Sequence, residues 1–215
     1  HIHMYPEISE QEYETSKYIK KCLEEIGLKA KIIGDTGVVS MLMNNPEYPT
    51  VGLRAEMDAL PIEEETNLEF KSKNKGVMHA CSHDGIVATA LGVTKLLYEH
   101  KDELKCNVKF IFEPAEEVGR GAKKLIKEKV LENPTVDKMV IFHYANSAPI
   151  GMEIQKGVST ATLGRVSIEI IGKSSHWGEP EKGINAISVA AKVIDAIDKI
   201  NEDLKEKIQF VLGMG

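Results

Sequence analysis

No apolar run in the sequence approaches the roughly 20 residues needed to cross a bilayer, and the first residues lack a basic stretch followed by an apolar one. We therefore expect neither a membrane span nor a secretory signal. Basic residues are also in deficit, because 27 Lys and Arg face 33 Asp and Glu, which gives a formal net charge of -6. Nucleic acids and anionic membranes are bound through basic surfaces, so we expect neither as a partner.

Cysteine is scarce as well. The three cysteines form an odd number and show no spacing typical of a disulfide framework, which fits a reducing compartment and predicts a cytoplasmic protein. Cys22 lies in an amphipathic stretch and Cys106 opens an apolar one, as is typical of small core residues. Cys81 differs because His79 and His83 flank it.

Apolar periodicity predicts an α/β fold. Helical spacing covers residues 10–26, 84–99 and 119–131, and short apolar runs predict strands over residues 30–33, 37–43, 50–55, 107–112 and 138–142. Ser9 and Glu12 form a capping-box pattern at the start of the first helix. Because helices alternate with apolar strands, we expect a mostly parallel sheet covered by helices.

The pattern changes near residue 160. Residues 166–171 alternate as a half-buried strand, 172–175 form a turn, 185–200 have helical periodicity and 208–212 begin another strand. We expect residues 1–160 to form one domain and residues 161–215 to form part of a second, small one. A β-α-β unit of about fifty residues is a poor candidate for an independent core, so we expect either that it packs heavily on the first domain or that the natural protein continues beyond Gly215.

Acidic residues and a histidine follow three of the predicted strands, at the strand ends where ligands collect in α/β sheets. Glu56 and Asp58 alternate at one strand end and therefore share a face. Glu116 and Glu117 follow the strand at 107–112. Two adjacent carboxylates repel each other unless a cation lies between them or one takes a proton. A metal ligand beside a proton-handling base meets that demand, and a solvated helix N-terminus is the alternative.

Cys81 and His83 lie two positions apart, so both side chains fall on one side of an extended segment. Thiolate, imidazole and carboxylate are the groups that zinc-type ions accept. With His143, which follows the strand at 138–142, they predict a metal site for one or two ions, with His79 and Asp84 as groups that orient the ligands. One carboxylate of the Glu116–Glu117 pair would hold the metal while its neighbour moves protons on a metal-bound water, which predicts a hydrolase.

Two interpretations stay open at this point. Cys81 is alternatively a nucleophile with His143 as its base, in a thiol hydrolase without a metal. His176 lies in a turn among Gly, Ser and Trp177, where it is either a contact to the substrate or transition state or a surface-loop histidine.

The order of the motifs HMYPEIS, LRAEMDALPIEEET, GVMHACSHDG, IFEPAEE, FH and IIGKSSH resembles that of zinc-dependent aminoacylases and carboxypeptidase-G-type amidohydrolases. The nearest branch contains hippurate hydrolases, indole-acetyl-amino-acid hydrolases and N-acetyl-diaminopimelate deacetylases. The resemblance implies a zinc-peptidase-like α/β catalytic domain with an inserted α+β lid that dimerises. It implies the general base Glu116, the oxyanion contact His176 and the metal ligands Cys81, His83, Glu117 and His143.

The implied activity is metal-dependent hydrolysis of the amide bond in N-acyl amino acids or small peptides. Zinc is the preferred metal, and Mn, Co or Ni also suit these donors. The resemblance implies a homodimer through the lid and a fifth ligand, a histidine late in the catalytic domain. Because the sequence stops at Gly215, the chain looks truncated within the lid. The alternative expectation is therefore an inactive fragment that only binds metal or a partner.

Overall fold

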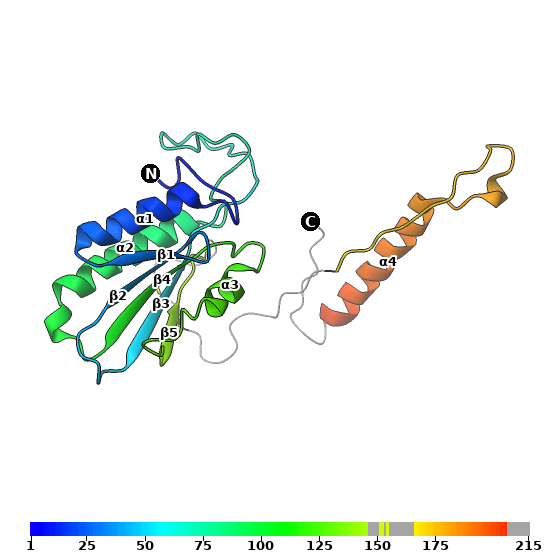
Figure 1. Cartoon of the computed structure of the whole chain (residues 1–215). Coiled ribbons are helices and arrows are strands. Elements are labelled where there is room, and N and C mark those ends of the chain that lie inside the picture. The colour runs from blue at the N-terminus through cyan, green and yellow to red at the C-terminus, as the bar shows by residue number, and fades with distance from the viewer. Residues whose placement is uncertain (146–150, 153, 155–165, 206–215) are drawn as a thin grey trace. The chain divides into compact units, whose positions relative to one another are not determined.

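The computed structural model describes residues 1–145, 151–152, 154 and 166–205 (Figure 1). The chain divides into two units, His1–Ala148 and Pro149–Gly215, and each is described by itself. The predicted domain boundary at residue 160 lies outside the described residues, so it stays a prediction. Among the described residues, no helix is both long and apolar enough to span a membrane.

The first unit contains a five-stranded sheet with the strand order β1-β2-β4-β3-β5. The strands are β1 (Ala30–Ile33), β2 (Gly37–Leu42), β3 (Thr50–Glu56), β4 (Asn107–Glu113) and β5 (Lys138–Ile141). Strand β2 runs antiparallel to both β1 and β4, whereas β3 is parallel to both β4 and β5. Four of the five strands therefore point the same way, and the predicted α/β fold with a mostly parallel sheet is confirmed.

Helices cover both faces of this sheet (Figure 1). They are α1 (Tyr13–Ile26), α2 (His83–Glu99) and α3 (Gly121–Lys127). Alternate side chains of a strand point to opposite faces. On β4, Phe110 and Phe112 join the core beneath α1 and α2, whereas Ile111 packs against Leu125 of α3. All seven residues of β4 are buried, as expected for a strand that is covered on both faces.

The three parallel neighbours β3, β4 and β5 end at the same edge of the sheet. Their register pairs Glu56 with Glu113 and Arg54 with Ile141. The segments that follow these strands therefore leave the sheet side by side. They carry the acids and the histidine that the sequence marks as candidate site residues.

The predicted capping box is wrong. Helix α1 begins at Tyr13, and the hydroxyl of Ser9 instead donates to the Asp58 carboxylate at 2.7 Å. The buried Glu12 carboxylate accepts hydrogen bonds at 2.8 Å from the main-chain N–H of Ala115 and from the Thr36 hydroxyl. The side chains of Ser9 and Glu12 thus make tertiary hydrogen bonds instead of a local cap, because both reach groups at the edge of the sheet where β3 and β4 end.

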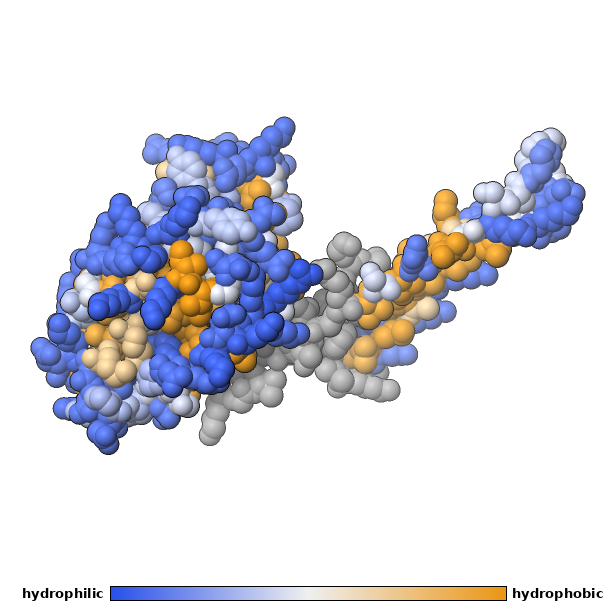
Figure 2. All heavy atoms as spheres, viewed as in Figure 1, coloured by the Kyte–Doolittle hydropathy of each residue, from blue (hydrophilic) through white to orange (hydrophobic). Residues whose placement is uncertain are grey.

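In the second unit, helix α4 (Ala186–Lys205) confirms the predicted helix and extends it by five residues. The Asn185 side chain caps it by accepting hydrogen bonds from the main-chain N–H groups of Ile187 and Ser188. Apolar side chains run along α4 (Figure 2), and Ile187, Ile194 and Ile200 are exposed.

The predicted strand at 166–171 is wrong. Within the described residues these positions pair with no other strand, and a strand needs a partner for its main-chain groups. An isolated antiparallel bridge between Lys173 and Ile184 closes the loop that contains His176. The predicted strand at 208–212 lies outside the described residues.

Lys109 of β4 fixes the connection between α3 and β5. Its side chain is buried on the α3 face, and its Nζ donates to the main-chain carbonyls of Val130, Glu132 and Pro134 at 2.9–3.0 Å. These three bonds use all three donors of the ammonium group. Because the connection leads into β5, Lys109 also helps to place the segment that carries His143.

We predict that Lys109→Met lowers the free energy of unfolding by about 2–4 kcal/mol. The buried Val130 carbonyl that loses its donor costs about 1–3 kcal/mol, and the partly buried carbonyls of Glu132 and Pro134 cost less because water can replace the ammonium. Urea unfolding followed by circular dichroism measures the change. The control is Lys95→Met on the exposed side of α2, which should stay within about 0.5 kcal/mol of the wild type. Equal effects of the two substitutions would contradict the role assigned to Lys109.

Candidate metal centre

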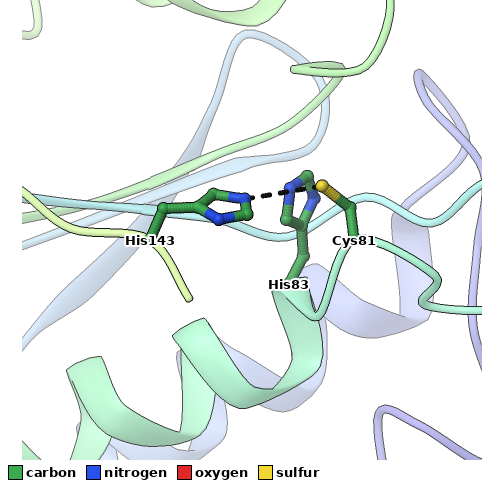
Figure 3. A group of neighbouring side chains, drawn as sticks. All are labelled: Cys81, His83 and His143. Atoms are coloured by element: carbon green, nitrogen blue, oxygen red, sulfur yellow. Dashed lines mark hydrogen bonds between the residues drawn. The ribbon is translucent and has the colours of Figure 1, made fainter. Parts of the chain in front are cut away.

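The structure brings Cys81, His83 and His143 together at the sheet edge where β3, β4 and β5 end (Figure 3). His83 is the first residue of α2, Cys81 lies in the segment just before it, and His143 follows β5 and points toward them. The Cys81 Sγ lies 3.4 Å from His143 Nε2, and the two imidazole rings are nearly perpendicular with centroids 5.8 Å apart. One potential ligand atom from each of the three residues lies within 4.8 Å of the other two.

Both histidines have the same tautomer. His83 Nδ1 donates to the main-chain carbonyl of Asp58, and His143 Nδ1 donates to that of Tyr144, both at 2.8 Å. In the neutral imidazole, Nε2 then carries a lone pair in each ring. Histidines that bind metals in proteins have this arrangement, with one nitrogen donating to a protein oxygen and the other free for the ion.

Three carboxylates face the fully buried His83. Oxygens of Glu56, Glu116 and Glu117 lie 3.9–4.0 Å from His83 Nε2. Among the described residues, His83 Nε2, Glu56 Oε2 and Glu117 Oε1 are buried and have no hydrogen-bond partner. Buried polar atoms without partners are costly, and lone pairs that face one another repel. A cation between them would satisfy all of these atoms.

The distances select a cation rather than a proton. A hydrogen bond between nitrogen and oxygen spans about 2.7–3.2 Å, so a proton on Nε2 would reach none of these oxygens. Zinc bonds to nitrogen and oxygen are about 2.0–2.2 Å long, so two donors to one ion lie at most about 4.4 Å apart. The separations of 3.9–4.0 Å fit within that limit, and so does the 3.4 Å between Cys81 and His143. The residues present therefore fit a divalent ion.

The charges at this edge of the sheet also favour a bound cation. Five carboxylates gather at this edge: Glu56, Asp58, Glu113, Glu116 and Glu117. In the described part of the chain, Arg54 is the only guanidinium or ammonium group that pairs with them; it contacts Glu56 and donates to Glu113 at 2.6 Å. The edge is therefore strongly negative unless a cation is bound.

The pKa shifts reflect this excess of negative charge. Burial raises the pKa of Glu116, and the neighbouring Glu56 and Glu117 raise it further. Although burial opposes a charged imidazolium, the hydrogen bond to Asp58 and the charge of Glu56 outweigh it and raise the pKa of His83. Burial together with the carboxylates of Glu117 and Glu116 raises the pKa of the Cys81 thiol to about 11. Reactive thiols need electropositive surroundings, so this site disfavours Cys81 as a metal-free nucleophile.

Asp58 joins the parts of the site. Besides its contact to His83, its carboxylate accepts hydrogen bonds from the Ser9 hydroxyl at 2.7 Å and from the Glu117 main-chain N–H at 3.1 Å. Burial would raise the pKa of Asp58, but the hydrogen bonds from His83, Ser9 and Glu117 outweigh it and lower that pKa. One carboxylate thus connects the end of β3, the loop after β4 and the start of α2.

The loop that presents Glu116 and Glu117 turns sharply. Ala115 has a φ of +50°, and its N–H is held by the buried Glu12. At Gly121, an added Cβ would overlap the carbonyl oxygen of Pro114, so glycine is required for α3 to start beneath this loop.

Tyr144 ties the segment that carries His143 to α2. Its hydroxyl lies 2.6 Å from Thr89 Oγ1 and donates to the Gly85 carbonyl at 3.2 Å. Its ring covers Gly85, where an added Cβ would lie 2.6 Å from the ring. These contacts hold His143 against the start of α2, with its Nε2 toward Cys81.

The structure thus brings together five of the six predicted site residues: Cys81, His83, Glu116, Glu117 and His143. The sixth, His176, lies in the second unit, where its Nδ1 accepts a hydrogen bond from the Gly178 N–H at 3.2 Å.

Sequence reasoning placed Glu56 and Asp58 on one face but assigned them no role, and it missed Tyr144. The sequence did contain an indication for Glu56 and Asp58, since they alternate at a predicted strand end, where ligands collect, as the other candidates do. Tyr144 had none, because its importance depends on a contact with a helix 55 positions earlier in the chain.

Comparison with known proteins gives one consistent result. The model of Peptidase family M20/M25/M40 matches residues 52–213. N-acetyl-L-cysteine deacetylase of Bacillus subtilis is 40% identical over 202 residues, which are 93% of this chain and 48% of the relative. Thermostable carboxypeptidase 1 of Saccharolobus solfataricus is 42% identical over 219 residues, which are 99% of this chain and 55% of the relative.

Among solved structures, a Bacillus subtilis protein described as a dinuclear metal binding peptidase of the M20 family superposes with a TM-score of 0.66 at 40% identity. The match covers 69% of this chain and 42% of that one. The chain therefore spans about half the length of the curated relatives it matches.

We predict that Tyr144→Ala weakens Zn²⁺ binding by about 10–100-fold, the range seen when groups that support metal ligands are removed. Tyr144→Phe keeps the ring over Gly85 and should therefore weaken Zn²⁺ binding by a smaller factor. Competition with a chromophoric chelator measures the dissociation constants, and the exposed Tyr13→Ala serves as a control. Wild-type affinity in Tyr144→Ala would show that the segment after β5 holds His143 without this contact.

Proposed function

The chain belongs to Peptidase family M20/M25/M40, and from this membership and the geometry of the site we propose that the protein is a metal-dependent amidohydrolase. It would cleave the amide bond of N-acyl amino acids or small peptides with a metal-activated water. The convergence of Cys81, His83, Glu117 and His143 beside Glu116 carries the proposal. The names of two relatives, a deacetylase of N-acetyl-L-cysteine and a carboxypeptidase, support this substrate class.

We assign Cys81, His83, Glu117 and His143 as the residues that would hold one or two divalent ions per subunit, with zinc preferred and Mn, Co or Ni as alternatives. When bound, the metal polarises the scissile carbonyl and lowers the pKa of the attacking water. The description of a similar Bacillus subtilis structure as dinuclear supports the two-ion state.

Glu116 is the proposed general base. Its side chain is 36% exposed, against 18% for Glu117, so it is the more accessible of the two to substrate and water. The raised pKa of Glu116 suits a group that both takes and returns a proton. Glu116 takes a proton from the water as the hydroxyl adds to the carbonyl carbon. It then gives that proton to the amide nitrogen as the C–N bond breaks, which releases a carboxylic acid and an amine.

His176 is the proposed contact to the oxyanion. Because its Nδ1 accepts a hydrogen bond from Gly178, the proton of the neutral ring lies on Nε2. This N–H can donate to negative charge that develops on the carbonyl oxygen. The tautomer is the opposite of that in His83 and His143, which supports a different role.

We further propose that the second unit belongs to a lid domain that forms a homodimer. The exposed apolar residues along α4 support a partner, since apolar patches of this kind are usually covered (Figure 2). The net charge of -6 supports a small-molecule substrate rather than a nucleic acid. All three cysteines, each in the described part of the chain, are free, which supports a cytoplasmic location.

We predict that Glu116→Gln retains bound metal but lowers kcat by about 10²-fold or more, the scale of general acid–base catalysis. Release of free amine from N-acetyl amino acids in the presence of Zn²⁺ or Mn²⁺ measures turnover, and elemental analysis measures metal. Glu65→Gln, which changes an exposed carboxylate, is the matched control. Undiminished hydrolysis by Glu116→Gln would remove Glu116 from the mechanism.

We predict that a chelator abolishes hydrolysis and that added Zn²⁺ restores it. A thiol hydrolase with Cys81 as nucleophile would keep its activity without metal. The same assay before and after chelation therefore separates the two chemistries, with dialysis against metal-free buffer as the control for loss of protein during treatment.

A further inference from the structure

We propose that Glu56 donates a carboxylate oxygen to the same cation that His83 holds, in addition to the ligands assigned above. This inference rests on the proposed function, because it concerns the same metal centre. It adds a hard oxygen donor from β3 to a set that otherwise comes from residues 81–83 at the start of α2, from the loop after β4 and from the segment after β5.

The Glu56 carboxylate is buried and incompletely satisfied. The residue is 4% exposed, and within the described residues its Oε2 has no hydrogen-bond partner. This oxygen lies 3.9 Å from His83 Nε2, which also lacks a partner there. The separation is too long for a hydrogen bond and within the reach of two donors to one ion. One potential ligand atom each from Glu56, His83 and Glu116 lies within 4.8 Å of the other two.

Arg54 fixes the direction of this carboxylate. Its Nη1 pairs with Glu56 Oε1, and its Nε donates to Glu113 at 2.6 Å. With Oε1 engaged by the guanidinium, Oε2 is the oxygen left to face His83. Arg54 also offsets part of the charge of the two buried carboxylates, so the pair of acids can lie side by side on β3 and β4.

Glu113 provides an internal comparison. It is paired with Glu56 in the sheet register, it shares Arg54 as its partner, and it is 5% exposed. Within the described residues, however, its salt bridge is to Arg54 alone and none connects it with His83. Two acids with nearly the same burial and the same cationic partner thus differ in their approach to the imidazole, which only Glu56 faces.

His83 can bind only one ion through Nε2, because its Nδ1 is engaged by the Asp58 carbonyl. The ion that His83 holds is therefore the one that Glu56 reaches. A carboxylate oxygen suits Mn²⁺ better than it suits softer ions, whereas the thiolate of Cys81 favours zinc. Glu56 should accordingly contribute more to the binding of Mn²⁺ than to that of Zn²⁺.

The test measures metal binding and not activity. The wild-type protein and its variants are stripped of metal, and the dissociation constants for Mn²⁺ and Zn²⁺ are measured by competition with a chromophoric chelator. We expect Glu56→Gln to weaken Mn²⁺ binding by at least about tenfold and Zn²⁺ binding by less. Glu56→Asp should also weaken Mn²⁺ binding, because the shorter side chain keeps the charge but withdraws the oxygen. Glu113→Gln, the matched control, removes the same charge and should weaken Mn²⁺ binding by much less than Glu56→Gln does.

The outcomes separate this inference from the proposed function. Equal weakening in Glu56→Gln and Glu113→Gln would reveal an effect of overall charge and would overturn the inference. Weaker binding in Cys81→Ser with wild-type binding in Glu56→Gln would overturn the inference and leave the ligand set intact. A wild-type protein that binds neither ion would overturn both. Thermal unfolding of the metal-free variants identifies any variant that has not folded. If Glu56→Gln does not fold, the Mn²⁺ affinity of Glu56→Asp decides whether Glu56 is a ligand.

Discussion

The hydrogen bond from His83 Nδ1 to the main-chain carbonyl of Asp58 is the interaction on which the site depends. It lies in the interior, where His83 is fully buried, so the ring cannot turn toward water. Once Nδ1 donates, the lone pair of Nε2 must face the carboxylates at the end of the sheet. The fold thereby fixes an arrangement that is unfavourable in isolation and favourable around a cation. Stability and metal binding are coupled in such a site, because the ion removes the repulsion.

The sheet makes this arrangement possible because its parallel strands end together. Strand β3 and the segments after β4 and β5 are far apart in the sequence. The register nevertheless places the ends of the three strands next to one another. Asp58 connects these strand ends. Its carboxylate accepts hydrogen bonds from Ser9 before α1 and from the Glu117 N–H after β4, and its main-chain carbonyl accepts one from His83 of α2. The candidate ligands Glu117 and His143 lie within a few residues of the ends of β4 and β5, whereas Cys81 and His83 follow the longer connection between β3 and α2.

Much of this could be predicted from sequence, because it follows from local patterns. The apolar run at residues 107–112 predicted strand β4, and the motifs around Cys81 and Glu116 identified the family, which the match over residues 52–213 confirms. The failures have a common physical cause. Ser9 was expected to cap α1, but its partner Asp58 lies 49 positions away and becomes visible only in the folded chain. The contribution of Tyr144 and the direction of Glu56 likewise depend on contacts between elements, which no local pattern encodes.

The tautomers of the histidines show how the main chain can prepare one residue type for different tasks. His83 and His143 each donate from Nδ1 to a carbonyl, so each offers a lone pair at Nε2, as a metal ligand must. In His176 the main-chain N–H of Gly178 donates to Nδ1, so Nε2 presents a proton instead. A histidine that presents a proton repels a metal ion and attracts an anion. The three rings are therefore distinguished by whether the neighbouring main-chain group is a carbonyl or an N–H, which the identity of the side chain alone does not reveal.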